Sequence, residues 1–304
     1  MIKILASDGL EKGAIAALEA KGCQVDVKFY DPDALCEAVK GYDVLIVRSA
    51  TKVREPQINA ACMTGTLKLV IRAGVSIDNI DKVCAEGWGI SVCNTPKASS
   101  DAVAELALAH MLSCARFISA AGHTMREGKW EKKAYEGIEL NGKTVGIVGY
   151  GRIGQALGRR CQALGMRVLA YDIYKVPELE CDTMRYAEMD ELLKSSDFIS
   201  LHVPSLPGQP VISRENLAVM KDGVIIVNTS RGTNVDEAAL LEALESCKVY
   251  GAGLDVFAEE PSKNEALYKH PRVSATPHIG ASTKEAQARI GAEIVDLIVK
   301  TFEL

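Results

Sequence analysis

An apolar run leads directly into a glycine-rich turn in the stretch Val145-Gly146-Ile147-Val148-Gly149-Tyr150-Gly151-Arg152-Ile153-Gly154. A helical pattern follows, and the next apolar run ends at Asp172. In a strand–turn–helix unit of this kind Gly149 makes the tight turn, Gly151 lets the backbone approach a pyrophosphate, and Gly154 lets helix and strand pack closely. The N–H groups at the start of the helix attract phosphates, and an acidic residue roughly twenty positions on binds a ribose 2′-OH. The sequence therefore predicts a dinucleotide site, and a glycine-rich turn that binds nothing is the less favoured interpretation.

Composition and charge limit the class of protein. With 304 residues, of which 48% are apolar and 25% charged, the chain is long enough for two globular domains that each bury a core. A net charge of −5 argues against general binding to nucleic acid or to a membrane surface, so any affinity for phosphate must be local. The nine cysteines contain no C-x-x-C pair, and the chain begins with a strand–helix pattern instead of a signal segment. We expect a cytoplasmic protein with reduced thiols and no metal site.

The longest apolar stretch, residues 102–121, contains Glu105, His110 and Arg116. Because charged and polar side chains are costly at the centre of a bilayer, we expect a buried helix of a globular domain there, over about residues 99–122. His110 lies in the middle of that pattern and is expected to be a packed core residue.

Apolar runs alternate with helical patterns along the whole chain, which is typical of parallel βαβ units. The first series of predicted strands covers residues 2–6, 25–29, 43–47, 67–71 and 90–93, and the second covers residues 145–149, 168–171, 198–203, 224–228, 250–256 and 273–275. The last predicted helix, residues 283–303, is expected to return to the first domain. The chain should therefore contain two doubly wound α/β domains, one formed by residues 1–98 and 283–304 and the other by residues 99–282.

Residues suited to hydride transfer follow strands of the second series, where open α/β sheets bind their ligands. Arg231 can hold a carboxylate with two parallel hydrogen bonds, although a surface arginine is an equally open interpretation. His278, on a loop shaped by proline and glycine, is the natural acid/base because an ordinary histidine titrates near neutrality. Glu260 can pair with His278 and favour its protonated form, the alternative being a solvated acid. Asp255, at the end of a strand, can face a nicotinamide.

Together these residues and the glycine-rich turn resemble the D-isomer-specific 2-hydroxyacid dehydrogenases. The resemblance covers nearly the whole chain and extends to residues 47–53, 72–74, 78–81, 137–143 and 276–283. It implies a Rossmann nucleotide-binding domain inserted in a flavodoxin-like substrate domain, NAD as the cofactor, and a homodimer built on the nucleotide domains. It also implies that Arg231 holds the substrate carboxylate and carbonyl, that His278 is the acid/base and that Glu260 is its partner.

The resemblance further implies which residues contact the ligands. The expected cofactor contacts are Gly149, Gly151, Arg152, Ile153, Gly154, Asp172, Pro204, Thr229, Ser230, Asp255, Gly280 and Ala281. The expected substrate contacts are Arg48, Arg72, Gly74 and Val75, with Arg48 at a phosphate group. Ser76 stands where the family usually has a second glycine, so the carboxylate-binding backbone near Gly74 is expected to be posed differently.

Within the family the chain is most similar to members that act on 3-phospho-D-glycerate. The expected reaction is oxidation to 3-phosphohydroxypyruvate in serine synthesis, in which a hydride leaves C2 while His278 takes the hydroxyl proton. Since the sequence ends at Leu304, without a further regulatory domain, feedback by serine is not expected. A reductase of glyoxylate or hydroxypyruvate is the alternative within the same class, and a dinucleotide-sensing binding protein is the alternative from another class.

Overall fold

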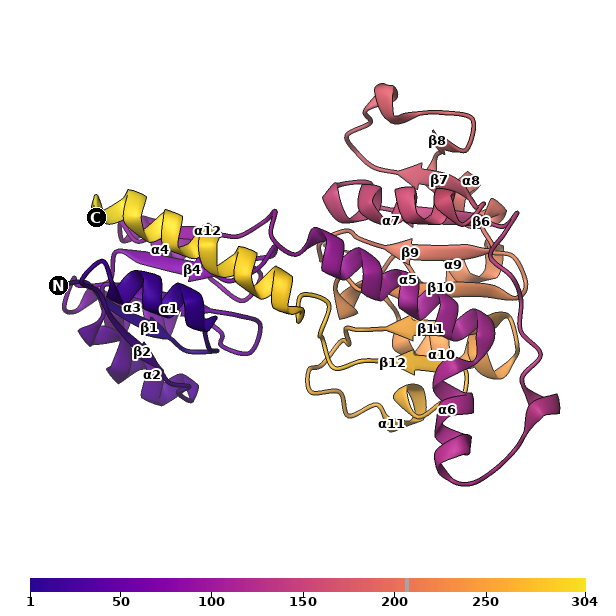
Figure 1. The fold of residues 1–304 in the computed structure, drawn as a ribbon, viewed down its shortest axis with the longest axis horizontal. Helices are drawn as coiled ribbons and strands as arrows, with labels where there is room; N and C mark the ends of the chain where they lie inside the picture. Colours follow the sequence, from indigo (N-terminus) through magenta and orange to yellow (C-terminus); the bar gives the residue numbers. More distant parts are fainter. Residues whose placement is uncertain (206–207) are drawn as a thin grey trace. The chain divides into compact units, whose positions relative to one another are not determined.

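Two units make up the chain in the computed structural model, which describes residues 1–205 and 208–304 (Figure 1). Unit 1 consists of residues 1–99 and 281–304, and unit 2 consists of residues 100–280.

Unit 1 is a five-stranded parallel sheet in the order β2-β1-β3-β4-β5. The strands are β1 (Lys3–Ala6), β2 (Gln24–Val27), β3 (Val44–Val47), β4 (Leu69–Arg72) and β5 (Ser91–Asn94). The helices are α1 (Lys12–Glu19), α2 (Pro32–Ala38), α3 (Glu55–Cys62), α4 (Lys82–Gly87) and α12 (Lys284–Phe302), with a short 3₁₀ turn η1 (Val39–Gly41). The strand order is the flavodoxin-like one.

The sheet of unit 1 is covered on both faces, which explains why β3 and β4 are buried at every position. Successive residues point to opposite faces: Ile46 packs with α1 and α12, whereas Leu45 packs with α2 and α3. Helix α12, yellow in Figure 1, lies beside α1 although the two are separated by most of the chain.

Unit 2 is a seven-stranded parallel sheet in the order β12-β11-β10-β9-β6-β7-β8. The strands are β6 (Thr144–Val148), β7 (Arg167–Tyr171), β8 (Met184–Tyr186), β9 (Phe198–Leu201), β10 (Val224–Asn228), β11 (Val249–Leu254) and β12 (Val273–Ala275). The helices are α5 (Ser100–Arg116), α6 (Ile118–Arg126), α7 (Arg152–Ala163), α8 (Met189–Ser195), α9 (Arg214–Val219), α10 (Glu237–Glu245) and α11 (Glu265–Tyr268). Three 3₁₀ turns complete it: η2 (Lys132–Ala134), η3 (Pro177–Leu179) and η4 (Gly232–Asn234).

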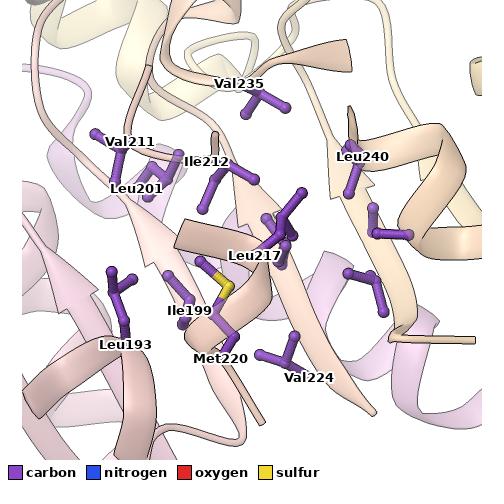
Figure 2. Close-up of a cluster of buried hydrophobic side chains, with 14 of the residues drawn as sticks. Leu193, Ile199, Leu201, Val211, Ile212, Leu217, Met220, Val224, Val235 and Leu240 are labelled. Carbon is purple, nitrogen blue, oxygen red and sulfur yellow. The ribbon is translucent and has the colours of Figure 1, made fainter. Parts of the chain in front are cut away.

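The order in which the chain adds strands to the sheet of unit 2 reverses at β6: β7 and β8 lie on one side of it, and β9 to β12 lie on the other. Such a switch point opens a crevice at the carboxyl ends of the strands. Helices α5 and α7 cover one face of the sheet, and α8, α9 and α10 cover the other. Figure 2 shows part of this second core, where Leu193, Leu217 and Leu240 from these helices surround Ile199 and Val224 of the sheet. The predicted Rossmann and flavodoxin-like sheets are thus confirmed.

Two details of the prediction were wrong. Unit 2 has seven strands instead of six, because β8 adds an edge strand beside β7. The helix predicted over residues 99–122 is broken at Phe117, whose φ is +54°, and α5 and α6 meet there with a bend of 68°. The ring of Phe117 lies against those of Tyr135 and Tyr250, with ring centroids 5.8 and 5.5 Å apart. Only α5 is the expected buried helix, since no residue of α6 is buried.

Across the described residues, no single helix is both long and apolar enough to cross a membrane, although the bent pair of α5 and α6 reaches such a length and composition together.

Candidate active site

The glycine-rich turn after β6 uses each of its three glycines differently. Gly149 has a φ of +93°, and a Cβ there would lie 2.8 Å from the carbonyl group of His202. A Cβ on Gly154 would lie 2.2 Å from the carbonyl oxygen of Gly149, so this position joins helix α7 to the turn. By contrast, a Cβ on Gly151 would meet nothing within 4 Å. The first and third glycines are needed for the fold, and the second leaves the backbone open to a ligand.

Several polar groups at this edge of the sheet make no hydrogen bond within the described part of the protein. Helix α7 begins after Gly151 without a side-chain cap, so its first N–H groups are available to an anion. The buried hydroxyl of Thr229, just after β10, and the buried Nδ1 of His202, just after β9, have no hydrogen-bond partner. Buried polar groups are rarely left unpaired unless a ligand or water completes them. This arrangement fits a dinucleotide.

Asp172 lies at the end of β7, beside the turn. Its Oδ2 accepts a hydrogen bond of 2.7 Å from the N–H of Tyr150, and its Oδ1 accepts one of 2.9 Å from the N–H of Tyr174. These bonds fix the carboxylate and leave lone pairs for a ribose hydroxyl. The nearby Lys175 forms an exposed ion pair with Glu188 at 2.7 Å.

His278 and Glu260 form a pair in unit 2, with 2.6 Å between His278 Nδ1 and Glu260 Oε2. Burial opposes ionisation of Glu260, but the hydrogen bond and charge of His278, the N–H of Phe257 and the charge of Arg231 outweigh it and lower the pKa of this carboxyl. A carboxylate on Nδ1 fixes the orientation of the ring. Nε2 is then the ring atom that can exchange a proton with a substrate.

Arg231 stands on a loop shaped by Asn228, the fully buried last residue of β10. Asn228 Oδ1 accepts from both the N–H and the hydroxyl of Ser230, and its Nδ2 donates to the carbonyl oxygen of Arg231 at 2.8 Å. Asn234 adds a bond to the Ser230 hydroxyl and another to the carbonyl oxygen of Val203. The sequence reasoning missed both asparagines. A polar residue that ends an otherwise apolar strand was the signal for Asn228.

Asp255, at 1% exposure, holds the loop that carries His278. Its carbonyl oxygen accepts from the N–H of His278, and its two carboxylate oxygens accept from the N–H groups of Ile279 and Gly280, each at 2.8 Å. These bonds stabilise a strained backbone, because His278 has a φ of +54°. The carboxylate is therefore turned into the loop.

The other expected cofactor residues of unit 2 lie near the same edge of its sheet. Arg152 and Ile153 open helix α7, and Pro204 is exposed after β9. Ala281 belongs to unit 1, where it packs against the apolar core.

The expected substrate residues lie in unit 1, at the carboxyl ends of two adjacent strands. Arg48 follows Val47, which pairs with Arg72 across β3 and β4. The Arg48 loop is fixed by Asp8, whose Oδ2 accepts from the N–H of Arg48 at 2.7 Å, and by Asn79, whose Nδ2 donates to the carbonyl oxygen of Arg48 at 2.7 Å. Neither Asp8 nor Asn79 was predicted as a site residue.

Arg72 is buried and turned toward its own loop. Its Nη1 donates to the carbonyl oxygen of Ala73 at 3.2 Å, and the guanidinium fills the space beside Gly74, where a Cβ would lie 1.4 Å from Nη1. Gly74 has a φ of +146°, and Val75 beside it is exposed. Arg48, half-buried, is thus the more accessible of the two arginines.

Within residues 1–205 and 208–304, no group of three His, Cys, Asp or Glu side chains is placed to hold a metal ion.

Comparisons with known proteins show the family of the chain. Residues 108–280 match the family model described as "D-isomer specific 2-hydroxyacid dehydrogenase, NAD binding domain", so NAD is the cofactor. The chain is 49% identical to the hydroxypyruvate reductase of Thermotoga maritima over 98% of its own length and 97% of that protein. It is 45% identical to the D-3-phosphoglycerate dehydrogenase of Methanocaldococcus jannaschii, over 99% of its own length but 57% of that protein. A solved glyoxylate reductase from Paecilomyes thermophila has a TM-score of 0.86 at 32% identity, covering 98% of this chain and 94% of that one.

Proposed function

The chain belongs to the D-isomer-specific 2-hydroxyacid dehydrogenases, and on this premise we propose that it oxidises 3-phospho-D-glycerate to 3-phosphohydroxypyruvate for serine synthesis. The observation that carries the choice of substrate is the position of Arg48 and Arg72 at the carboxyl ends of adjacent strands in unit 1. In a protein of net charge −5, a phosphate with nearly two negative charges needs such a local source of positive charge. The 45% identity to a D-3-phosphoglycerate dehydrogenase supports the same choice.

In the proposed reaction the chain's own residues bind the substrate and move one proton. Arg231 holds the substrate carboxylate and the developing carbonyl group, and Gly74 and Val75 add backbone contacts. His278 Nε2 takes the proton of the C2 hydroxyl, while Glu260 stabilises the imidazolium that forms. NAD, when bound, accepts the hydride that leaves C2. The O–H and C–H bonds break as the C=O bond forms, so electrons and protons balance.

We assign NAD binding to the domain of residues 99–282 and substrate binding to the domain of residues 1–98 and 283–304. The proposed contacts to NAD are Gly149, Gly151, Arg152, Ile153, Gly154, Asp172, Pro204, Thr229, Ser230, Asp255, Gly280 and Ala281. We also propose that the enzyme is cytoplasmic and acts as a homodimer. The free thiols of all nine cysteines support a reducing compartment.

Replacing Arg48 tests the proposed substrate. Arg48→Ala should raise KM for 3-phosphoglycerate by about tenfold or more, because a hydrogen bond to a charged group contributes about 1.5 to 3 kcal/mol. Turnover of glyoxylate and hydroxypyruvate, which lack the phosphate, should stay nearly unchanged. Lys68→Ala removes an exposed charge just before the amino end of β4 and serves as the control. Equal damage to both kinds of substrate would mean that Arg48 supports the loop and not the phosphate.

Reduction of hydroxypyruvate or glyoxylate is the second candidate function. It is supported by the 49% identity to a hydroxypyruvate reductase over 97% of that protein's length, whereas the chain spans 57% of the length of the phosphoglycerate dehydrogenase. Following NADH absorbance with 3-phosphoglycerate, 3-phosphohydroxypyruvate, hydroxypyruvate and glyoxylate separates the two. A kcat/KM for hydroxypyruvate above that for 3-phosphohydroxypyruvate would favour the reductase.

A further inference from the structure

His110 is buried in α5, yet both of its ring nitrogens are hydrogen-bonded. Nδ1 lies 3.0 Å from the hydroxyl of Ser274 in β12, and Nε2 lies 3.0 Å from the hydroxyl of Thr276 just after β12. A Cβ on Gly253 of β11 would lie 2.4 Å from the Cβ of His110, so α5 approaches the sheet closely at this point. The predicted packed core residue is confirmed, since His110 is 2% exposed, and the histidine also forms a polar bridge between α5 and the segment of β12.

The proton positions in this bridge follow from the partners. The Thr276 hydroxyl donates its single proton to Asp255 Oδ1 at 2.6 Å, and it must therefore accept from His110 Nε2–H. Burial lowers the pKa of His110, against a smaller opposing effect of the Asp255 charge, so the ring is neutral near neutral pH. Nδ1 then accepts from the Ser274 hydroxyl. The hydrogen bonds run in one direction, from Ser274 through His110 and Thr276 to Asp255.

Asp255 is the residue that holds the loop of His278 through three backbone N–H groups. Its Oδ1 is shared between the Ile279 N–H and the Thr276 hydroxyl, so a shift of that hydroxyl changes where the carboxylate sits. Because the loop carries a residue with positive φ, it depends on its surroundings to stay in place. His110 is thus connected to His278 by two intervening side chains.

We propose that His110 is a positioning residue: its imidazole orders Thr276, and through Thr276 the Asp255 carboxylate, so that the loop of residues 278–280 presents His278 for proton transfer. The role of His278 in proton transfer rests on the proposed function, whereas the ordering of the loop does not. Glu260 is the charged group hydrogen-bonded to the His278 ring, and the charge of Arg231 acts on that carboxylate. Asp255 contacts His278 through its backbone carbonyl oxygen, and its charge acts on His110. Displacement of the loop would change the contact between His278 and Glu260 without removing either side chain.

Hydrogen exchange tests the ordering of the loop without any substrate. In His110→Leu, and in Thr276→Val, which keeps the side-chain shape, the amides of residues 278–280 should exchange about tenfold faster or more, while the amides of β6 are unchanged. His110→Gln, which keeps one polar contact, should restore part of the protection. Met111→Ala opens a cavity at a neighbouring buried position of α5 and is the packing control. Unchanged exchange at residues 278–280 in both His110→Leu and Thr276→Val overturns the proposal.

Kinetics then tests the link to proton transfer. In His110→Leu, kcat should fall about tenfold with KM altered less than about twofold. The inflection of the pH profile for oxidation should move to lower pH, as expected when the contact between Glu260 and His278 is weakened. Met111→Ala should lower thermal stability and leave the pH profile in place. A pH profile that does not move in His110→Leu would overturn the proposal that His110 positions His278 for proton transfer. If the unmodified protein oxidises no 2-hydroxy acid, the proposed function fails, and the exchange experiment still decides whether His110 orders the loop.

Discussion

At the scale of single residues, the Glu260–His278 pair governs how turnover should depend on pH. The pKa of Glu260 is lowered mainly by His278, against its burial, so the carboxylate remains ionised at neutral pH and favours the imidazolium. Oxidation of a hydroxy acid needs neutral His278 and should therefore rise with pH, whereas reduction of a keto acid should fall. Glu260→Gln should move the inflection of kcat/KM for oxidation to lower pH, and His278→Asn should lower kcat by roughly 10² to 10⁴. An unchanged inflection in Glu260→Gln would contradict the pairing. The exposed Glu259→Gln is the control.

His202 gives a residue-scale prediction about stability. Burial lowers its pKa from 6.5 to about 4. Below pH 6.5 the unfolded chain binds a proton that the folded chain does not, so stability is complete above this pH and is lost as pH falls toward about 4. His202→Gln should abolish this loss, which amounts to about 2 kcal/mol by about pH 5. The free energy of unfolding in urea, measured above pH 6.5 and at about pH 5, tests this. His123→Gln, at an exposed histidine, is the control. Equal acid sensitivity of His202→Gln and the unmodified protein would count against a neutral, buried imidazole.

At the scale of elements, the turn between β6 and α7 separates folding from binding. Gly154→Ala places a Cβ against the backbone oxygen of Gly149 and should destabilise unit 2 by about 2 kcal/mol or more. The Cβ added in Gly151→Ala would meet nothing within 4 Å, so the free energy of unfolding should change by less than about 1 kcal/mol. The variant should nevertheless bind NADH about tenfold or more weakly, because the pyrophosphate needs that space. Thermal unfolding and NADH titration of the two variants test this. A Gly151→Ala protein that binds NADH normally would remove the turn from the site.

Elements with a local signal were predictable from sequence. Central strands such as β3 and β4 are buried at every position and nearly all apolar, and the turn of Gly149 has its own pattern, so their positions follow from residues nearby. Strand β8 is only three residues, Met184–Tyr186, at a sheet edge, and no periodicity can mark so short a strand. The break at Phe117 has no glycine or proline to mark it, and the rings that Phe117 contacts belong to residues 135 and 250. The partners of His110 are likewise 164 and 166 positions away, so its hydrogen bonds could be found only in the folded chain.

At the scale of the whole molecule, the exposed apolar residues of unit 2 argue for self-association. Helix α6 buries none of its residues, and Ile118, Met125 and Trp130 are all more than half exposed. Exposed apolar side chains gathered on one helix and the segment after it are typical of a surface that another protein chain covers. The protein should sediment as a dimer at micromolar concentration, and Trp130→Glu or Met125→Asp should yield the 32.7 kDa monomer.

The other tryptophan supplies the control for this prediction. Trp88 is also exposed, but it lies in unit 1, after α4, so Trp88→Glu should leave the dimer intact. A charged residue within an apolar interface opposes association, whereas one outside it does not, so the two substitutions should differ strongly. Dissociation by Trp88→Glu alone would move the interface to unit 1, and a monomer for the unmodified protein would refute the dimer. With the interface on α6, dissociation leaves the Glu260–His278 pair intact, so a monomeric Trp130→Glu variant should still bind NADH.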